Sequence, residues 1–364
     1  MSLTALFTPL TINKLTLANR IVMAPMTRAF SPGGVPGPDV AAYYRRRAEH
    51  GVGLIVTEGT VVGHPASSSN AAVPRFHGED ALAGWARVVT AVHEVGGRIM
   101  PQLWHVGTMR KPGDGPNPEV PPIGPSGLAR PGEPVLAPMT EAEIAGVIEA
   151  YAQSAASAAR LGFDGIELHG AHGYLIDQFF WEATNRRTDR YGGSLEARAR
   201  FGVEVVAACR RAVGPDYPIV LRFSQWKIQD YTARLVTSPA ELERFVAPFT
   251  AAGVDVFHCS TRRFWQPEFE GSDLNLAGWV KKLTGRATIT VGSIGLDSDF
   301  MADAGRVADR SQLERLDRMI VDGEVDLVAV GRALLADPAW AAKVREGRTS
   351  ELVPYARDAV KTLV

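Results

Sequence analysis

The segment IELHGAHGYLIDQFF, residues 166–180, brings two histidines and a tyrosine close together in the chain. His169 and His172 are three residues apart, and Tyr174 follows two residues later. Two imidazole N–H groups that donate to one oxygen polarise a carbonyl and stabilise the charge that develops on it. A nearby tyrosine hydroxyl can act as a general acid. The trio is therefore suited to the addition of hydride to an activated alkene.

Two other interpretations of the trio stay open at this point. A zinc site built on His169 and His172 would need a third and a fourth ligand. Only His105 and His258 lie near other expected strand ends, and neither forms a familiar ligand pattern, so we expect no metal. Alternatively, the two histidines are hydrogen-bonded core residues beside a packed tyrosine, although a place at the end of a strand favours a functional role.

Two further polar residues end apolar runs that we interpret as strands. Gln102 ends one run and Arg222 lies near the end of another. A buried glutamine or arginine costs free energy unless a partner satisfies its hydrogen-bonding groups. The two residues therefore predict a polar ligand between the two strand ends.

Two later segments indicate an anion site. VGSIG contains Gly292 and Ser293, and VGRALLADP contains Gly331 and Arg332. Glycines let backbone N–H groups approach an anion, and an arginine can add a forked charged contact. Each glycine alone could equally mark a tight turn between a strand and a helix. Together they predict a phosphate site, which (β/α)8 barrels often build after their last two strands.

The elements that must position these residues are short apolar runs separated by long helical patterns. We expect strands at 21–25, 53–58, 98–103, 165–169, 219–224, 256–260, 288–293 and 327–332. Most runs are rich in β-branched residues and too short for a helix, which is typical of a buried parallel sheet. Eight strand–helix units predict a (β/α)8 TIM barrel. An open doubly wound sheet is the alternative, but no GxGxxG motif follows the first strand.

The segment 140–162 illustrates one helix of this repeat. Thr140 and Glu143 form a capping box, and Gly162 is a suitable stop. The apolar residues that recur on one helical face are Ile144, Val147, Ile148, Tyr151 and Ala155.

Two stretches lie outside the repeat. Residues 1–20 are expected to form a short N-terminal lid at the bottom of the barrel. Residues 106–139 are rich in proline and glycine and follow the third strand, so they emerge at the catalytic face. A loop this long is usually functional or disordered, and we interpret it as a cover over the pocket. Residues 1–364 are expected to form a single domain.

Composition limits the classes of function. The chain has 364 residues, 46% of them apolar, and a net charge of −1, so no general attraction to nucleic acid or anionic membranes is expected. Cys209 and Cys259 are too few for a four-cysteine iron–sulfur cluster or a secreted disulfide framework. No apolar run is long enough to span a membrane, and the first residues do not resemble a signal peptide. These features predict a cytoplasmic protein.

With these segments together, the sequence resembles the Old Yellow Enzyme family of FMN-dependent ene-reductases. The resemblance covers nearly the whole chain. It is carried by LFTPLTINKLTLANRIVMAPMTR near the N-terminus, by HGAHGYLIDQFFWEATNRRTDRYGGSLEARARF in the centre, and by TEG, PQLW, LRFS, VGS and VGRALLADP elsewhere. The family implies a single barrel that binds FMN non-covalently.

The resemblance implies a role for each residue described above. Residues that would contact FMN are Pro25, Met26 and Thr27 along the flavin, Gly59 and Gln102 at its pyrimidine edge, Arg222 beside N1 and O2, and Gly292, Ser293, Gly331 and Arg332 at the phosphate. His169 and His172 would bind the carbonyl oxygen of the substrate. Tyr174 would protonate the carbon α to that carbonyl.

Some residues resemble the larger, classical branch of the family. Thr27 stands where another branch has cysteine, and Trp104 occupies a position that shapes the substrate pocket. His172 occupies a place where some members carry asparagine. The loop 262–275 is less typical: its aromatic residues, including Trp265, are expected either to cap the substrate pocket or to pack against the loop 106–139. The C-terminal segment resembles the family only weakly, which leaves the role of Tyr355 open.

The implied activity is the NAD(P)H-dependent reduction of activated C=C bonds by a ping-pong mechanism. NADPH or NADH would reduce FMN and leave, and an α,β-unsaturated carbonyl or nitro compound would then take hydride at Cβ from flavin N5 and a proton at Cα from Tyr174. The alternatives are an FMN-dependent dehydrogenase or demethylase, a metal-dependent TIM-barrel hydrolase with His169 and His172 as ligands, and a non-catalytic flavin-binding protein. We expect a monomer or a homodimer.

Overall fold

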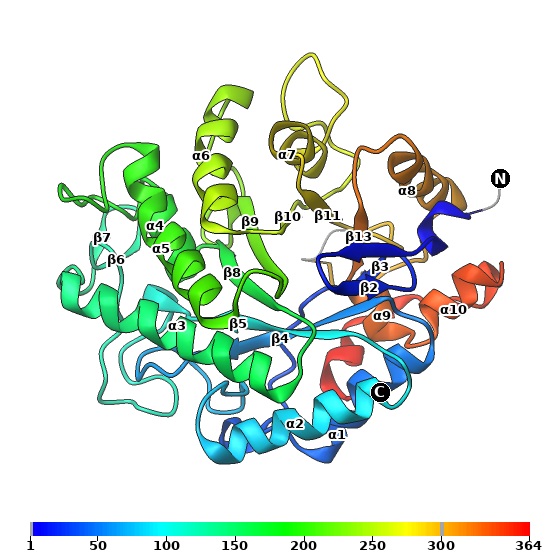
Figure 1. Cartoon of the computed structure of the whole chain (residues 1–364), viewed down its shortest axis with the longest axis horizontal. Coiled ribbons are helices and arrows are strands. Elements are labelled where there is room, and N and C mark those ends of the chain that lie inside the picture. The colour runs from blue at the N-terminus through cyan, green and yellow to red at the C-terminus, as the bar shows by residue number, and fades with distance from the viewer. Residues whose placement is uncertain (1–2, 299–301) are drawn as a thin grey trace.

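The computed structural model describes residues 3–298 and 302–364, and its centre is a closed barrel of parallel strands in the order β10-β11-β13-β3-β4-β5-β8-β9 (Figure 1). The barrel strands are β3 (Ile21–Met23), β4 (Leu54–Val61), β5 (Ile99–Trp104), β8 (Ile166–His172), β9 (Ile219–Lys227), β10 (Val256–Ser260), β11 (Ala287–Val291) and β13 (Leu327–Val330). Each of them overlaps one of the strands expected from the sequence. The predicted (β/α)8 barrel is therefore confirmed.

Four barrel strands, β4, β5, β8 and β9, extend beyond their predicted ends, and two of these extensions shape the site. β8 continues to His172 and β9 continues to Lys227. The reason is that the two strands resume pairing after a shift of register that follows Gly170, so that His172 lies opposite Lys227. The extension fixes His172 on a strand instead of in a loop.

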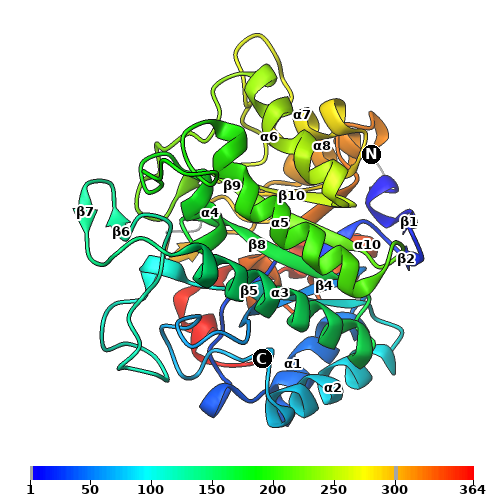
Figure 2. The same ribbon diagram turned by 60° about the vertical axis from the view of Figure 1, so that its left-hand side comes forward.

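Helices surround the barrel, as the two views show (Figures 1 and 2). They are α1 (Pro38–Glu49), α2 (Glu79–His93), α3 (Glu141–Leu161), α4 (Leu175–Phe180), α5 (Leu195–Val213), α6 (Pro239–Ala252), α7 (Leu276–Thr284), α8 (Arg310–Val321), α9 (Arg332–Ala336) and α10 (Trp340–Arg345). Among the described residues, no helix is both long and apolar enough to cross a membrane.

Helix α3 begins and ends where the sequence predicted. Thr140 and Glu143 form the capping box, and Gly162 closes the helix with a left-handed φ of 84°. The predicted apolar face packs inward: Ile144, Val147, Tyr151 and Ala155 are buried, and Ile148 is partly buried.

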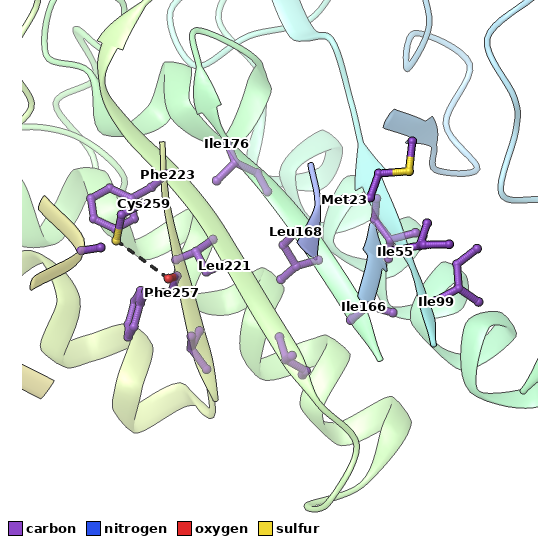
Figure 3. Packing of buried hydrophobic residues seen from close by; sticks show 14 of the residues in the cluster. Met23, Ile55, Ile99, Ile166, Leu168, Ile176, Leu221, Phe223, Phe257 and Cys259 are labelled. Carbon is purple, nitrogen blue, oxygen red and sulfur yellow. Dashed lines mark hydrogen bonds between the residues drawn. The ribbon is translucent and has the colours of Figure 1, made fainter. Parts of the chain in front are cut away.

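The main core lies between the barrel and the helices (Figure 3). Leu168 of β8 lies opposite Leu221 of β9, and Ile176 of α4 packs in the same cluster. All three side chains are almost completely buried. Burial of a side chain of this size stabilises a fold by about 1.5–3 kcal/mol. This packing holds β8 and β9, which carry much of the site described below.

The N-terminal hairpin of β1 (Leu10–Ile12) and β2 (Leu15–Leu17) closes the bottom of the barrel. Its residues Ile12, Leu15 and Leu17 belong to a second apolar cluster, together with Leu54 and Val256 at the first positions of their strands. The predicted N-terminal lid is therefore confirmed for the described part of residues 1–20, and residues 1–2 lie outside it.

The loop after β5 contains the small hairpin of β6 (Leu128–Arg130) and β7 (Glu133–Pro134). Arg187, from the loop after α4, holds it by donating to the carbonyls of Pro125 (2.8 Å) and Met139 (2.5 Å). No residue of 106–139 lines the large cavity at the barrel mouth. The interpretation of this loop as a cover over the pocket is therefore wrong.

Candidate active site

A cavity of about 440 Å³ lies at the carboxyl ends of the barrel strands. Most residues that the sequence singled out line it: Pro25, Met26, Thr27, Gln102, Trp104, His169, His172, Tyr174, Arg222, Gly292, Ser293, Gly331 and Arg332. These residues come from six barrel strands and from the turns that follow them. The fold thus brings together side chains that are up to about 300 positions apart in the chain.

His169, His172, Tyr174 and Trp104 form one aromatic cluster in the wall of the cavity. The ring centroids of His169 and Tyr174 are 5.0 Å apart, those of Trp104 and Tyr174 are 4.8 Å apart, and those of the two histidines are 5.2 Å apart. All three pairs pack edge to face, which is a favoured arrangement of aromatic rings. The predicted trio is therefore one compact group.

A turn in a strained backbone conformation orients the side chains of His172 and Tyr174 in this cluster. His172 has a φ of 65°, which is uncommon for a residue other than glycine. Its backbone N–H donates to Ser224 Oγ (3.0 Å), and the N–H of Gly173 donates to Asp177 Oδ2 (2.7 Å). Asp177 also accepts from Lys227 Nζ at 2.6 Å, and both of these side chains are fully buried. The pair from α4 and β9 fixes the turn between His172 and Tyr174.

Both histidines of the trio are neutral. Burial lowers the pKa of His169 and of His172 well below the usual value, and the charge of Arg222 lowers both further. His169 Nδ1 accepts from the N–H of Ala171 (3.4 Å), so its proton lies on Nε2. A neutral imidazole with a fixed tautomer is a directed hydrogen-bond donor.

Ser260 of β10 orients the second histidine. Its Oγ lies 2.8 Å from His172 Nε2 and 3.5 Å from Arg222 Nη2. Since arginine can only donate, the hydroxyl proton of Ser260 is available for His172 Nε2, which favours a His172 proton on Nδ1. The indole of Trp226 stacks on His172, with ring centroids 4.5 Å apart.

The hydroxyl of Tyr174 is protonated at neutral pH. Burial raises its pKa to about 12. An uncharged phenol in this position can donate a hydrogen bond and can give up a proton when a strong base forms beside it.

A buried polar network lies inside the barrel next to the trio. Gln102 Nε2 donates to Glu167 Oε1 (2.8 Å), and Glu167 Oε2 lies 2.6 Å from His258 Nδ1. Burial raises the pKa of Glu167, but the interactions with His258, Arg222 and Gln102 outweigh that effect and leave the pKa below its usual value. The carboxylate balances the charge of Arg222.

Arg222 retains an unsatisfied donor. Its Nε is buried and has no hydrogen-bond partner among the described residues. A buried unsatisfied donor costs about 1–3 kcal/mol. Because Arg222 lines the cavity together with Gln102, this donor is compatible with the polar ligand that the sequence predicted between these two residues.

The turns after β11 and β13 form another end of the cavity. Gly292 has a φ of 147° and Ser293 a φ of 55°, and a Cβ on Gly292 would come within 2.8 Å of the carbonyl oxygen of Thr261. Only glycine therefore fits this turn. A Cβ on Gly331 would meet no atom closer than 3.7 Å, so this backbone is open to a ligand. Arg332 lines the same end.

Glu58 fixes the turn that carries Thr27. Its Oε2 accepts from the backbone N–H groups of Arg28 (2.8 Å) and Ala29 (2.9 Å). Burial raises the pKa of Glu58 to about 7. The neighbouring residues Pro25, Met26 and Thr27 line the cavity.

Two predicted contact residues do not reach the cavity. Gly59 lies behind Trp104, where a Cβ would come within 2.6 Å of the indole, so it provides room for that side chain. Trp265 packs against Phe264 (5.2 Å between centroids), and its carbonyl accepts from Arg315 of α8. Phe269 packs against Trp279 of α7. The loop 262–275 is thus drawn towards α7 and α8, and neither a substrate contact by Trp265 nor packing on the loop 106–139 is supported.

The sequence did not indicate several cavity residues. They include Ala24, Arg28, Trp226, Ile228, Ser260, Arg262, Tyr355 and Val360. Trp226 and Ile228 follow the predicted end of β9, and a longer apolar–polar alternation there was the available signal. Glu167 and His258 are single polar residues within apolar strand runs, which could have indicated a buried network.

The remaining histidines considered as ligands lie in other surroundings. His105 Nε2 is 3.0 Å from His64 Nδ1, and His258 binds Glu167. Within residues 3–298 and 302–364, no three or more His, Cys, Asp or Glu side chains are arranged to hold a metal ion.

The fold and the site define a (β/α)8 barrel with a polar ligand cavity at the carboxyl ends of its strands. The model of the NADH:flavin oxidoreductase / NADH oxidase family matches residues 5–351. The chain therefore belongs to this family, which includes the Old Yellow Enzymes, and the resemblance seen in the sequence is confirmed.

Individual relatives agree with this assignment. NADH oxidase of Thermoanaerobacter brockii is 37% identical over 360 residues, which cover 95% of this chain and 52% of that protein. The chain thus spans about half the length of this relative. The structure of morphinone reductase in complex with tetrahydroNAD has a TM-score of 0.78 at 31% identity, covering 94% of this chain and 91% of that one. Old Yellow Enzyme from Pichia sp. AKU4542 has a TM-score of 0.80 at 26% identity, covering 98% and 90%.

Proposed function

We propose that this protein is an NAD(P)H-dependent ene-reductase that uses FMN and reduces the activated C=C bond of α,β-unsaturated carbonyl or nitro compounds. The observation that supports this most is the convergence of His169, His172 and Tyr174 on the cavity that Arg222 and Gln102 also line. Neutral donors, a protonated phenol and a guanidinium are thereby gathered around one cavity, in which a cofactor and a substrate would lie together.

The residues of the cavity fit FMN. The open backbone at Gly331, with Gly292, Ser293 and Arg332, would hold the phosphate, and Pro25, Met26 and Thr27 would lie along the flavin. Gln102 and the unpartnered Nε of Arg222 would bind its polar edge. Bound FMN would supply the hydride chemistry, which no side chain of the chain can provide.

The histidine pair would bind the electron-withdrawing oxygen of the substrate. His169 offers Nε2–H and His172 offers Nδ1–H, each from a neutral ring whose other nitrogen is already hydrogen-bonded. Donors that are oriented before the reaction stabilise charge that develops on the oxygen without further reorganisation. This arrangement favours addition at Cβ.

Tyr174 would then protonate Cα. Its pKa of about 12 keeps the proton in place until the carbanion-like carbon forms. The edge-to-face contacts with Trp104 and His169 hold its ring against the wall that binds the substrate oxygen.

An anaerobic product analysis tests this function. The protein loaded with FMN is mixed with NADPH, and separately with NADH, and a cyclic enone, and the products are identified. The proposal requires the saturated ketone in amounts equal to the nicotinamide oxidised. A desaturated or demethylated product from a saturated substrate would favour the FMN-dependent dehydrogenase or demethylase instead. Bound FMN without turnover of any enone or nitroalkene would favour a non-catalytic flavin protein.

A further inference from the structure

The segment 355–363, which we call the strap, borders the cavity described above. It consists of β14 (Tyr355–Ala356), the 3-10 helix Arg357–Lys361 and the two residues that follow. Tyr355 and Val360 line the cavity. The match to the family model ends at residue 351, so the strap lies outside the part of the chain that defines the family.

Arg28 is the main attachment of the strap. Its Nη2 donates to the carbonyl oxygens of Ala359 (3.2 Å), Val360 (3.0 Å) and Thr362 (2.7 Å). Arg46 of α1 donates to the carbonyl of Leu363. Hydrogen bonds from a charged donor are stronger than neutral ones. One guanidinium thus holds three carbonyl oxygens within four residues of a mostly exposed segment.

Arg28 is itself fixed within the site. Its backbone N–H donates to the buried carboxylate of Glu58, and its guanidinium carbon lies 5.1 Å from the ring centroid of Tyr43. The preceding residue, Thr27, lines the cavity. The strap is therefore connected through one residue to the turn that would lie along the flavin.

The other end of the strap covers the predicted phosphate site. The ring of Tyr355 is 7% exposed and lies 5.1 Å from the guanidinium carbon of Arg332. β14 pairs with β12 (Ala304–Gly305), which fixes this end of the strap to the loop after β11. Tyr355 thus packs over the guanidinium of Arg332, which is partly buried.

We infer that the strap retains FMN in the cavity and that Arg28 acts as its clamp. Tyr355 would shield the phosphate end, and Val360 would close the mouth beside Thr27. The inference rests on the proposed FMN site. It assigns a role in cofactor positioning to Arg28, to the strap backbone that Arg28 holds, and to the side chains of Tyr355 and Val360.

Titration with FMN tests the inference without relying on turnover. The wild type, a chain that ends at Pro354, and Arg28→Leu are stripped of FMN, and the Kd is measured from quenching of flavin fluorescence. The contacts of Glu58 are with backbone atoms, so they survive in Arg28→Leu. Loss of the clamp is expected to raise the Kd on the order of tenfold, as for the loss of charged hydrogen bonds. Lys361→Ala, whose exposed side chain pairs with exposed Asp358, is the matched control and should bind as the wild type does.

The shortened chain that also carries Arg28→Leu distinguishes a clamp from a direct contact with FMN. If Arg28 acts through the strap, the double change raises the Kd no further than the shortening alone. Additive effects, or a Kd equal to that of the wild type in both single variants, would overturn the inference. If the shortened chain does not fold, the Kd of Arg28→Leu against Lys361→Ala decides. A wild type that binds no FMN would instead refute the proposed function itself.

Discussion

At the scale of single residues, the site depends on protonation states that burial imposes. His169 and His172 are neutral because the barrel interior disfavours their charge, and Arg222 adds to that effect. Tyr174 keeps its proton for the same reason. The convergence of these three residues could be predicted from the sequence, because they lie on one strand or directly after it. Their partners Ser260 and Trp226 could not, because they come from other strands.

Tyr174→Phe is expected to slow alkene reduction by about 10²–10⁴-fold, the usual contribution of a general acid. Phenylalanine keeps the packing against Trp104 but cannot donate a proton. Flavin reduction by NAD(P)H, which needs no proton from Tyr174, should change little. Rapid-mixing measurements of the two half-reactions check this, and equal losses in both would contradict the role.

His169→Ala is expected to weaken binding of phenol-like ligands by roughly 5- to 100-fold. The change removes one oriented donor worth about 1–3 kcal/mol in a buried site. The spectral change of the bound flavin on titration with the phenol gives the affinity. His50→Ala, at the C-terminal end of α1, is the control. An affinity unchanged in both variants would exclude the proposed binding of the ligand oxygen by His169.

At the scale of elements, buried charges hold the turns that carry the site. Glu58 of β4 fixes the turn after β3, and the pair of Asp177 and Lys227 fixes the turn after β8. The sequence predicted both strands but not these hydrogen bonds and this ion pair. Lys227 lies beyond the predicted end of β9. The apolar–polar alternation continues to this residue, but nothing in the local pattern showed that the lysine side chain is buried.

Glu58→Gln should change the pH dependence of stability. The pKa of Glu58 is about 7 in the folded state and 4.5 is its ordinary value. The stabilisation that protonated Glu58 contributes to the fold is therefore fully present below about pH 4.5 and is lost as the pH rises through 7. The free energy of unfolding of the wild type, relative to the variant, should fall by about 3 kcal/mol between about pH 4.5 and 8. Urea unfolding at several pH values measures it, and a difference that stays constant would contradict the raised pKa.

Lys227→Met should destabilise the fold by about 3–5 kcal/mol, because it leaves the buried carboxylate of Asp177 unpaired. Asp177→Asn combined with Lys227→Met should recover a large part of this loss, since no buried charge remains. Lys361→Met breaks an exposed pair and should leave stability almost unchanged, because solvent screens such a pair. Denaturant unfolding compares the three variants. A double variant no more stable than Lys227→Met would contradict the claim that the unpaired carboxylate of Asp177 causes the loss of stability.

At the scale of the whole molecule, the sequence predicted the barrel because eight apolar runs repeat with helices between them. The convergence of Gln102, Arg222 and Arg332 followed from the rule that such barrels carry their sites at the strand ends. The long loops were less predictable. Residues 106–139 and Trp265 were expected over the cavity but are held elsewhere by Arg187 and by α7 and α8. Instead, Tyr355 and Val360 of the strap line the cavity. The sequence could not indicate this, because Arg28 binds backbone carbonyls of the strap, which every residue type carries.

The most direct test of the account is the visible spectrum of the protein purified with added FMN and then mixed with NADPH in the absence of oxygen. We predict a yellow protein that retains about one FMN per chain and bleaches with NADPH or, failing that, with NADH. A Trp265→Ala variant, whose change lies outside the cavity, should behave in the same way. A protein that stays colourless after incubation with FMN would contradict the assignment of Arg222, Gln102 and Arg332 to a flavin site, and with it the proposed reaction.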